Sequence, residues 1–529
     1  MRYFTIVILL IFSISISKSQ NSQPYSGKSL IKIQSSNNDI IDALLELNVV
    51  PITCRGSILN SNLIVDSLTI SWLKKQSVPF VIIHNDLEKT IELEMDNIQK
   101  TKNNRSENWY TVYRELHEIE DHINVIVEEN EIVTKNIIGQ SYEGREITVI
   151  KVGVDDFTEN KPSIFINGCQ HAREWITPMA TTYLIEQLSI QYNTNAEVNM
   201  LLNLVDIYIL PVFNPDGYVY TWEEDRWWRK NRQINLGSDC VGIDLNRNWD
   251  FDWNGEQSTS KDPCSYIYVG TAPFSAQETN IVSEYIASIP NLVSHIDVHN
   301  YSALIVGPWA SSDDQTDDTS EVYCLGTKMQ SAVSLTNDYP YIFGTGTVND
   351  LLYLISGGMM DWVYSTMSSL SFLYELRPAS LYYYDSNFDG LSAFDNDEQE
   401  ILATCEEFYQ GVLEMIRWAY FDNCEAVTGC SDPEADNYYC NPPLGDMLCL
   451  YTVDPYIPPQ NNGAYNLLEY GLPLGFVDDG SCIYSNVIDL NSIEKNIIKR
   501  IDYLGRDNSS KGFSICIYDD GTVTKQHLK

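Results

Sequence analysis

The chain has 529 residues, with 33 Lys and Arg against 73 Asp and Glu, and a formal net charge of −40. This length exceeds one domain of about 100–200 residues, and the 44% hydrophobic content argues against global disorder. The acidity excludes a typical nucleic-acid-binding protein, because phosphates are bound by clustered Lys and Arg, and it disfavours binding to anionic membranes.

The N-terminus has the layout of a signal peptide. Arg2 precedes an apolar run over residues 4–16, and the small residues Ser17 and Ser19 follow before Gln20. This run is too short to cross a bilayer, and no later stretch reaches the roughly 20 apolar residues of a membrane helix. We therefore expect a secreted protein, or one in the lumen of a lysosome-like or digestive compartment, whose 12 cysteines can form disulfides.

Three further segments differ in composition. Residues 20–105 read as α/β, with strands at 45–50 and 80–83, a helix at 64–75, and an exposed linker around Lys100, Lys102 and Arg105. Residues 106–424 alternate strands (162–167, 205–212, 293–298) with helices (177–192, 277–289), which indicates a mostly parallel sheet covered on both faces. Residues 425–529 are rich in Cys, Pro and Gly, which is typical of a small disulfide-stapled module.

Candidate metal ligands follow two of these strands. His171 and Glu174 come directly after the strand at 162–167, and His299 ends the strand at 293–298. A His-x-x-Glu pair alone is more often two surface residues. Crevices in open α/β sheets, however, lie at the carboxyl ends of the strands, where all three residues are placed. Two imidazoles and one carboxylate suit a zinc ion that keeps a fourth position open.

Cationic and amide residues cluster between the two halves of this ligand set. They form the strings Arg226-Trp-Trp-Arg229-Lys230 and Asp244-Leu-Asn246-Arg247-Asn248. A guanidinium can grip a carboxylate through paired hydrogen bonds, which Lys cannot do. Tyr353, Ser356-Gly-Gly and Glu375-Leu-Arg377 follow later in the chain.

In this order, these strings resemble the secreted zinc metallocarboxypeptidases of the carboxypeptidase A/B family, with their propeptide. Further matching strings are Gly139-Gln-Ser-Tyr-Glu-Gly-Arg145 and Asn214-Pro-Asp-Gly217. The resemblance implies an α/β fold with a mixed, mainly parallel eight-stranded sheet flanked by helices. It also implies a signal peptide at 1–19, an α+β propeptide with its activation linker at 20–105, and a catalytic domain at 106–424. The acidic Cys-rich extension at 425–529 lies outside the family's core.

Carboxypeptidase A is itself a known example of a zinc site with two histidines and one glutamate. By the resemblance, His171, Glu174 and His299 bind one zinc ion, and Asp244 holds the His171 ring through its other nitrogen. Glu375 is the general base that takes a proton from water and returns it to the leaving amine, and Arg229 stabilises the oxyanion. Further implied roles are binding of the substrate's terminal carboxylate (Asn246, Arg247, Tyr353), outer subsites (Arg173, Arg226) and a disulfide (Cys240 with Cys264).

In this family the residue at the floor of the pocket for the leaving side chain sets the specificity. Counting from Ser356-Gly-Gly places Met360 there. The expected walls contain no acid; they are Val306, Val348, Leu352, Ile355 and Leu373. We therefore expect a preference for hydrophobic C-terminal residues, and a latent precursor activated by a trypsin-like protease that cuts near Lys100, Lys102 or Arg105.

Some questions stay open at this point. A catalytically inactive relative would lack a ligand or the base, whereas all of these residues are present here. A protein whose C-terminal extension is the functional part, through an unknown partner, is a second alternative. Cys169 is either a buried thiol or bridged, and Cys324 and Cys405 are possible partners of each other.

Overall fold

The computed structural model describes residues 24–33, 40, 43–44, 49–51, 62–103, 108–154, 161–256, 258–345, 353–378, 398–421, 428–429, 477–478, 497–501, 512–518 and 523–528. The chain divides into two compact units, residues 1–427 with 440–476, and residues 428–439 with 477–529. The predicted signal peptide, Arg105, Val348 and Leu352 lie outside the described residues. No described helix is long and apolar enough to cross a membrane.

The first unit begins with a small α/β region. Its four-stranded antiparallel sheet has the order β2 (Val50–Pro51), β3 (Asn62–Asp66), β1 (Lys28–Ile33) and β4 (Phe80–His84). The helices α2 (Ser67–Lys75) and α3 (Leu87–Asn103) accompany this sheet. One small core joins the sheet to α2 through buried residues such as Ile31, Val65 and Leu73. The strand expected at 80–83 is confirmed, whereas of the strand expected at 45–50 only Val50 is in a described strand.

The helix predicted over residues 64–75 begins later than expected. Ile64 and Val65 belong to β3, where they pack into two different apolar clusters because successive side chains of a strand point to opposite faces. The helix starts after Asp66, whose side chain accepts a hydrogen bond from the Thr69 backbone N–H at 2.7 Å.

The exposed linker predicted around Lys100 and Lys102 is wrong for these two residues. Both belong to α3, which extends to Asn103. The Lys102 side chain is half-buried and forms ion pairs with Glu118 and Glu115 of the following domain. Lys100 is exposed on the helix surface.

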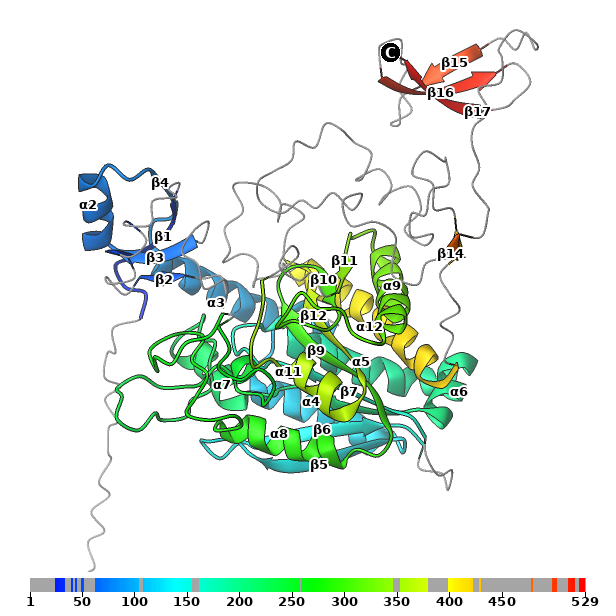
Figure 1. The fold of residues 1–529 in the computed structure, drawn as a ribbon, viewed down its shortest axis with the longest axis horizontal. Coiled ribbons are helices and arrows are strands. Elements are labelled where there is room, and N and C mark those ends of the chain that lie inside the picture. Colours follow the sequence, from blue (N-terminus) through cyan, green and yellow to red (C-terminus); the bar gives the residue numbers. More distant parts are fainter. Residues whose placement is uncertain are drawn as a thin grey trace, which may run out of the picture. The chain divides into compact units, whose positions relative to one another are not determined.

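The larger region that follows the N-terminal α/β region is built on one eight-stranded sheet (Figure 1). The sheet order is β11 (Ile342–Gly344), β10 (Leu304–Val306), β12 (Leu370–Leu376), β9 (Leu292–Asn300), β7 (Ser163–Gly168), β8 (Asp206–Leu210), β6 (Glu146–Val152) and β5 (Val133–Gln140). The central strands β12, β9, β7 and β8 are parallel. The strands β6 and β5 are antiparallel to their neighbours, and so is β10 to β12. The predicted mixed, mainly parallel sheet is confirmed.

Both faces of this sheet are covered. On one face, α4 (Leu116–Glu129), α5 (Ile176–Thr194), α6 (Ala196–Leu204), α9 (Thr319–Thr336) and α12 (Glu398–Phe421) contribute to the larger core. On the other face lie α8 (Gln277–Ser288) and α11 (Met359–Met367). Ile164 and Ile166 of β7 pack into the first core and Phe165 into the second, as expected for a strand buried on both sides.

The structure shows which of several cysteines are disulfide-bonded and which are free thiols. The structure contains the disulfide between Cys240 and Cys264 that the resemblance implies. Cys169 and Cys405 are buried free thiols. Cys324 is disulfide-bonded, so the suggested pairing of Cys324 with Cys405 is wrong.

The second unit contains two small sheets. The strands β13 (Thr428–Gly429) and β14 (Val477–Asp478) pair in parallel. The strands β15 (Ile497–Ile501), β16 (Gly512–Tyr518) and β17 (Val523–Leu528) form an antiparallel sheet. Most of the predicted Cys-rich module lies outside the described residues.

Candidate metal centre and active site

The three predicted metal ligands meet at the carboxyl ends of neighbouring parallel strands. His171 and Glu174 lie in the turn between β7 and α5, and His299 lies near the end of β9. The Nδ1 atoms of the two histidines are 3.1 Å apart, and Glu174 lies 2.8 Å from His171 Nδ1 and 3.2 Å from His299 Nδ1. All three side chains are buried, and their ligand atoms lie within 4.8 Å of one another. Two converging imidazole nitrogens and a carboxylate are a donor set that fits zinc.

The charges around this cluster favour an ionised carboxylate. Burial raises the pKa of Glu174, but His171 and His299 outweigh burial and hold this pKa well below its usual range. Burial and the nearby Arg229 guanidinium lower the pKa of His171, which favours the neutral ring that a metal needs.

Asp244 connects the metal cluster to Arg229. Its Oδ1 atom lies 3.4 Å from His171 Nε2, on the side of the ring away from the cluster. Its Oδ2 atom accepts hydrogen bonds from Arg229 Nε and Nη2 at 3.1 and 2.9 Å. Burial raises the pKa of Asp244, but Arg229, Arg247 and His171 outweigh it and hold the pKa well below its usual range. The carboxylate therefore stays ionised and orients both partners.

Asn246 and Arg247 follow in the short helical turn η2 (Leu245–Arg247), for which Asp244 is the N-cap. Asn246 Nδ2 lies 3.1 Å from His299 Nε2. The guanidinium of Arg247 is buried and donates from Nε to Ser258 O at 2.8 Å and from Nη1 to Asn246 O at 2.7 Å. Its Nη2 atom has no hydrogen-bond partner among the described residues. A buried cation with an unused donor, one residue after the Asn246 amide that faces His299, suits an anionic group of a substrate.

Glu375 lies on β12 in register with His299 on β9. It does not belong to the metal cluster. Burial raises the pKa of Glu375 to about 8, so its carboxyl group can hold and release a proton near neutral pH. The environment of its carboxyl group therefore differs from that of Glu174, the predicted metal ligand.

Comparison with known proteins agrees with this geometry. The sequence pattern of the zinc carboxypeptidases matches residues 119–411. The chain is 32% identical over 339 residues to carboxypeptidase B of Rattus norvegicus, covering 64% of this chain and 77% of the relative. It is 31% identical over 352 residues to carboxypeptidase A2 of the same species, covering 65% and 81%.

The chain belongs to the zinc carboxypeptidase family. A crystal structure of carboxypeptidase A from Helicoverpa armigera aligns with a TM-score of 0.65 at 26% identity, over 76% of this chain and all of that chain. The protein is therefore a metallocarboxypeptidase that uses zinc and acts on peptides with a free C-terminus. A-type and B-type relatives match almost equally well, so the preferred C-terminal residue has to be argued from the pocket.

The residue expected at the pocket floor of this zinc carboxypeptidase, Met360, is buried at the start of α11. It packs in an apolar cluster with three of the expected wall residues, Val306, Ile355 and Leu373. Tyr353 is half-buried and packs against the same cluster. The next residue, Asp361, is turned toward the backbone N–H groups of Ala310 and Ser311, at 2.8 and 2.9 Å.

The two residues expected at outer subsites are in contact with each other. Arg226 stacks on the Trp175 ring, 3.6 Å from its centroid, and donates from Nη1 to Arg173 O at 3.0 Å. Its Nε atom donates to Glu94 of α3 at 2.9 Å. The neighbouring Trp227 packs with residues of the N-terminal α/β region, including Tyr25 and Leu87.

One buried group beside the metal cluster was missed from the sequence. Asp297 Oδ2 lies 2.9 Å from His299 Nε2. The available signal was the spacing His295-x-Asp297-x-His299, which places all three side chains on one face of a strand.

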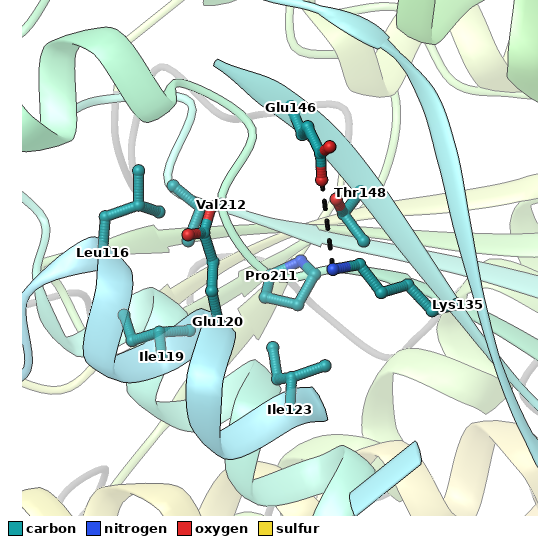
Figure 2. A pocket seen from close by; sticks show the side chains of 9 residues that line it. All are labelled: Leu116, Ile119, Glu120, Ile123, Lys135, Glu146, Thr148, Pro211 and Val212. Atoms are coloured by element: carbon teal, nitrogen blue, oxygen red, sulfur yellow. Dashed lines mark ion pairs between the residues drawn. The ribbon is translucent and has the colours of Figure 1, made fainter. Parts of the chain in front are cut away.

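A pocket elsewhere on the domain shares none of the site residues named above. It lies where α4 faces β5 and β6, with the Lys135–Glu146 ion pair at 4.0 Å (Figure 2). It is lined by Leu116, Ile119, Glu120, Ile123, Lys135, Glu146, Thr148, Pro211 and Val212. We assign it no role in the peptidase reaction.

Proposed function

We propose that the protein is secreted and removes hydrophobic residues from the C-termini of peptides and proteins, with zinc held by His171, Glu174 and His299. The observation that carries this proposal is the Arg247 Nη2 donor, which has no hydrogen-bond partner among the described residues; Arg247 directly follows Asn246, whose Nδ2 lies 3.1 Å from His299 Nε2. The C-terminus is the only backbone carboxylate of a peptide, so a buried guanidinium at this point selects chain ends. Asn246 and Tyr353 complete the carboxylate site.

The catalytic roles follow from the positions of the side chains. Bound zinc polarises the scissile carbonyl and lowers the pKa of water. Glu375 takes the proton from the attacking water and passes it to the leaving amine, for which a pKa of about 8 is suitable. Arg229, held by Asp244, stabilises the negative charge that develops on the carbonyl oxygen.

The apolar surroundings of Met360 support the hydrophobic preference. Burying a Lys or Arg side chain there without a partner costs several kcal/mol, whereas a Leu or Phe side chain gains about 1.5–3 kcal/mol. The Asp361 carboxylate, which follows Met360 in the chain, already accepts hydrogen bonds from the backbone N–H groups of Ala310 and Ser311.

A specificity switch tests this proposal. Peptides that differ only in a C-terminal Leu, Phe, Lys, Arg or Glu are incubated with the mature enzyme, and release of the terminal residue is followed by mass. We expect Leu and Phe to leave fastest, and Met360→Asp to reverse the order in favour of Lys and Arg. Met200→Asp is the control, because Met200 is an exposed residue of α6. Fastest release of Lys or Arg by the unaltered enzyme contradicts the proposal.

We also propose that residues 20–105 are a propeptide that keeps the precursor latent. In support, Glu94 binds Arg226, and Tyr25 packs on Trp227 at a ring distance of 4.7 Å and donates a hydrogen bond to Asp225. The N-terminal region thus contacts residues expected to bind the outer part of a substrate. A trypsin-like protease that cuts at the exposed Lys100 or nearby would release it.

A further inference from the structure

A column of buried polar side chains runs along β9 toward the metal cluster. His295, Asp297 and His299 alternate along this strand, so they share one face of the sheet. All three are buried, on the face where Phe165 stacks with the His295 ring at 5.8 Å. A buried carboxylate in such surroundings is costly unless it is fully bonded, so the contacts of Asp297 reveal its role.

The two carboxylate oxygens of Asp297 have different partners. Oδ1 accepts hydrogen bonds from Asn167 Nδ2 and Gln170 Nε2, both at 2.7 Å. Oδ2 lies 2.9 Å from His299 Nε2 as an ion-pair contact and accepts no hydrogen bond from a described residue. One oxygen therefore fixes the carboxylate in the sheet, and the other is presented to the imidazole.

The second neighbour of His299 Nε2 cannot do the same. Asn246 Oδ1 accepts the backbone N–H of Met359 at 2.8 Å, which turns the Asn246 amide nitrogen toward His299. That nitrogen is a donor, so it cannot accept the Nε2 proton of a neutral ring. Because His299 Nδ1 faces the metal cluster, the ring proton belongs on Nε2, and Asp297 Oδ2 is its available acceptor.

We propose that Asp297 is a positioning residue that fixes the tautomer and orientation of His299 for metal binding, as Asp244 does for His171. This inference rests on the proposed metal site. Its consequence is a site in which each histidine ligand is supported by its own buried carboxylate, and in which the Asn246 amide stays free to donate to a substrate carboxylate.

The hydrogen bonds behind Asp297 have a consistent direction. His295 Nε2 lies 2.9 Å from Asn167 Oδ1, which can only accept, so His295 carries its proton on Nε2 and the Ser371 hydroxyl, 2.8 Å from Nδ1, donates to the ring. The Asn167 Nδ2 group must then point to Asp297. Burial lowers the pKa of His295 to about 4, so this ring stays neutral at the pH of most assays. The orientation of Asp297 is thus determined by three strands of the sheet.

Zinc affinity, measured by competition with a chelator, tests the inference apart from turnover. Asp297→Asn keeps the shape but presents a donor to His299 Nε2, so zinc binding should weaken about 10–100-fold. Asp216→Asn is the matched control. Asp216 is also fully buried, and it bonds Ser141 Oγ at 2.6 Å and the Glu143 N–H at 2.7 Å, outside the metal cluster. The zinc affinity of the Asp216→Asn variant should stay within about twofold of the wild-type value. This is well below the loss of about 10–100-fold that is expected when a group supporting a metal ligand is removed.

A third variant separates this inference from the proposed metal site. If His299→Ala keeps wild-type zinc affinity, the metal site itself is wrong. If His299→Ala loses zinc but Asp297→Asn does not weaken it, only the role of Asp297 is wrong.

A measurement on the unaltered protein covers the case in which Asp297→Asn does not fold. In zinc-loaded protein labelled with ¹⁵N-histidine, His299 should carry a slowly exchanging proton on Nε2. An unprotonated Nε2 overturns the inference.

Discussion

At the scale of single residues, Glu375 and Glu174 are two carboxylates with different environments. Glu174 is held ionised by two imidazoles, whereas burial raises the pKa of Glu375 to about 8. Glu375→Gln should therefore leave zinc bound at one ion per chain and lower kcat/KM by about 10²–10⁴-fold, the usual contribution of a general base. Metal analysis and peptide hydrolysis on the same sample measure both quantities.

Glu186→Gln is the control for this change. Glu186 is a half-buried carboxylate of α5 near His122, at 3.6 Å, and it does not contact the site. Its loss should leave kcat/KM close to wild type. Near-wild-type turnover by Glu375→Gln would show that another group moves the proton.

The site residues could be predicted from the sequence because their order and spacing are specific. His171, Glu174 and His299 converge because parallel strands end at the same edge of the sheet, and the strands themselves were recognisable as apolar runs. Asp297 was not predicted, because its role depends on which amide and imidazole atoms face it across β7 and β9. The alternation of His295, Asp297 and His299 marks a shared strand face, but the cross-strand partners of Asp297 are set by register, which this alternation does not reveal.

At the scale of elements, the start of α2 shows where local propensity was misleading. Residues 64–75 contain a helical run, but Ile64 and Val65 are β-branched and pair with β1 in an antiparallel sheet. The change from strand to helix occurs at Asp66, which caps the helix through the Thr69 N–H and hydroxyl groups. The capping signal was present in the sequence, while the strand partner was distant in the chain.

The Asp66 cap can be tested directly. Asp66→Ala should destabilise α2 by about 1 kcal/mol, the typical cost of losing an Asp N-cap. Hydrogen exchange of the α2 amides should then be about fivefold faster, because local opening determines their protection. Asp96→Ala, at an exposed position inside α3, should leave these amides unchanged. Equal protection in both variants would mean that packing alone determines where the helix begins.

At the scale of the whole molecule, the metal cluster and every other described site residue belong to the first compact unit. The sheets of the second unit pair among their own strands. The described strands of the second unit therefore contribute no residue to the metal cluster. The resemblance on which the site was predicted does not cover this region, so its role could not be inferred in the same way.

The contact between Glu94 and Arg226 makes the proposed latency testable. The Arg226 side chain is fully buried and that of Glu94 is 14% exposed, so solvent screens this pair less than it screens a surface ion pair. A hydrogen bond to a charged group contributes about 1.5–3 kcal/mol. Glu94→Gln in the intact precursor should therefore raise its activity on small peptides by about 10–100-fold, at about 1.4 kcal/mol per tenfold change.

The control is Glu92→Gln, at an exposed position of the same helix. It removes the same charge without touching Arg226 and should leave the precursor inactive. After trypsin treatment all three proteins should reach the same activity, because the contact is then gone. An unaltered precursor that is already as active as its trypsin-treated form would rule out latency, and equal activation by Glu92→Gln would assign the effect to net charge rather than to the ion pair.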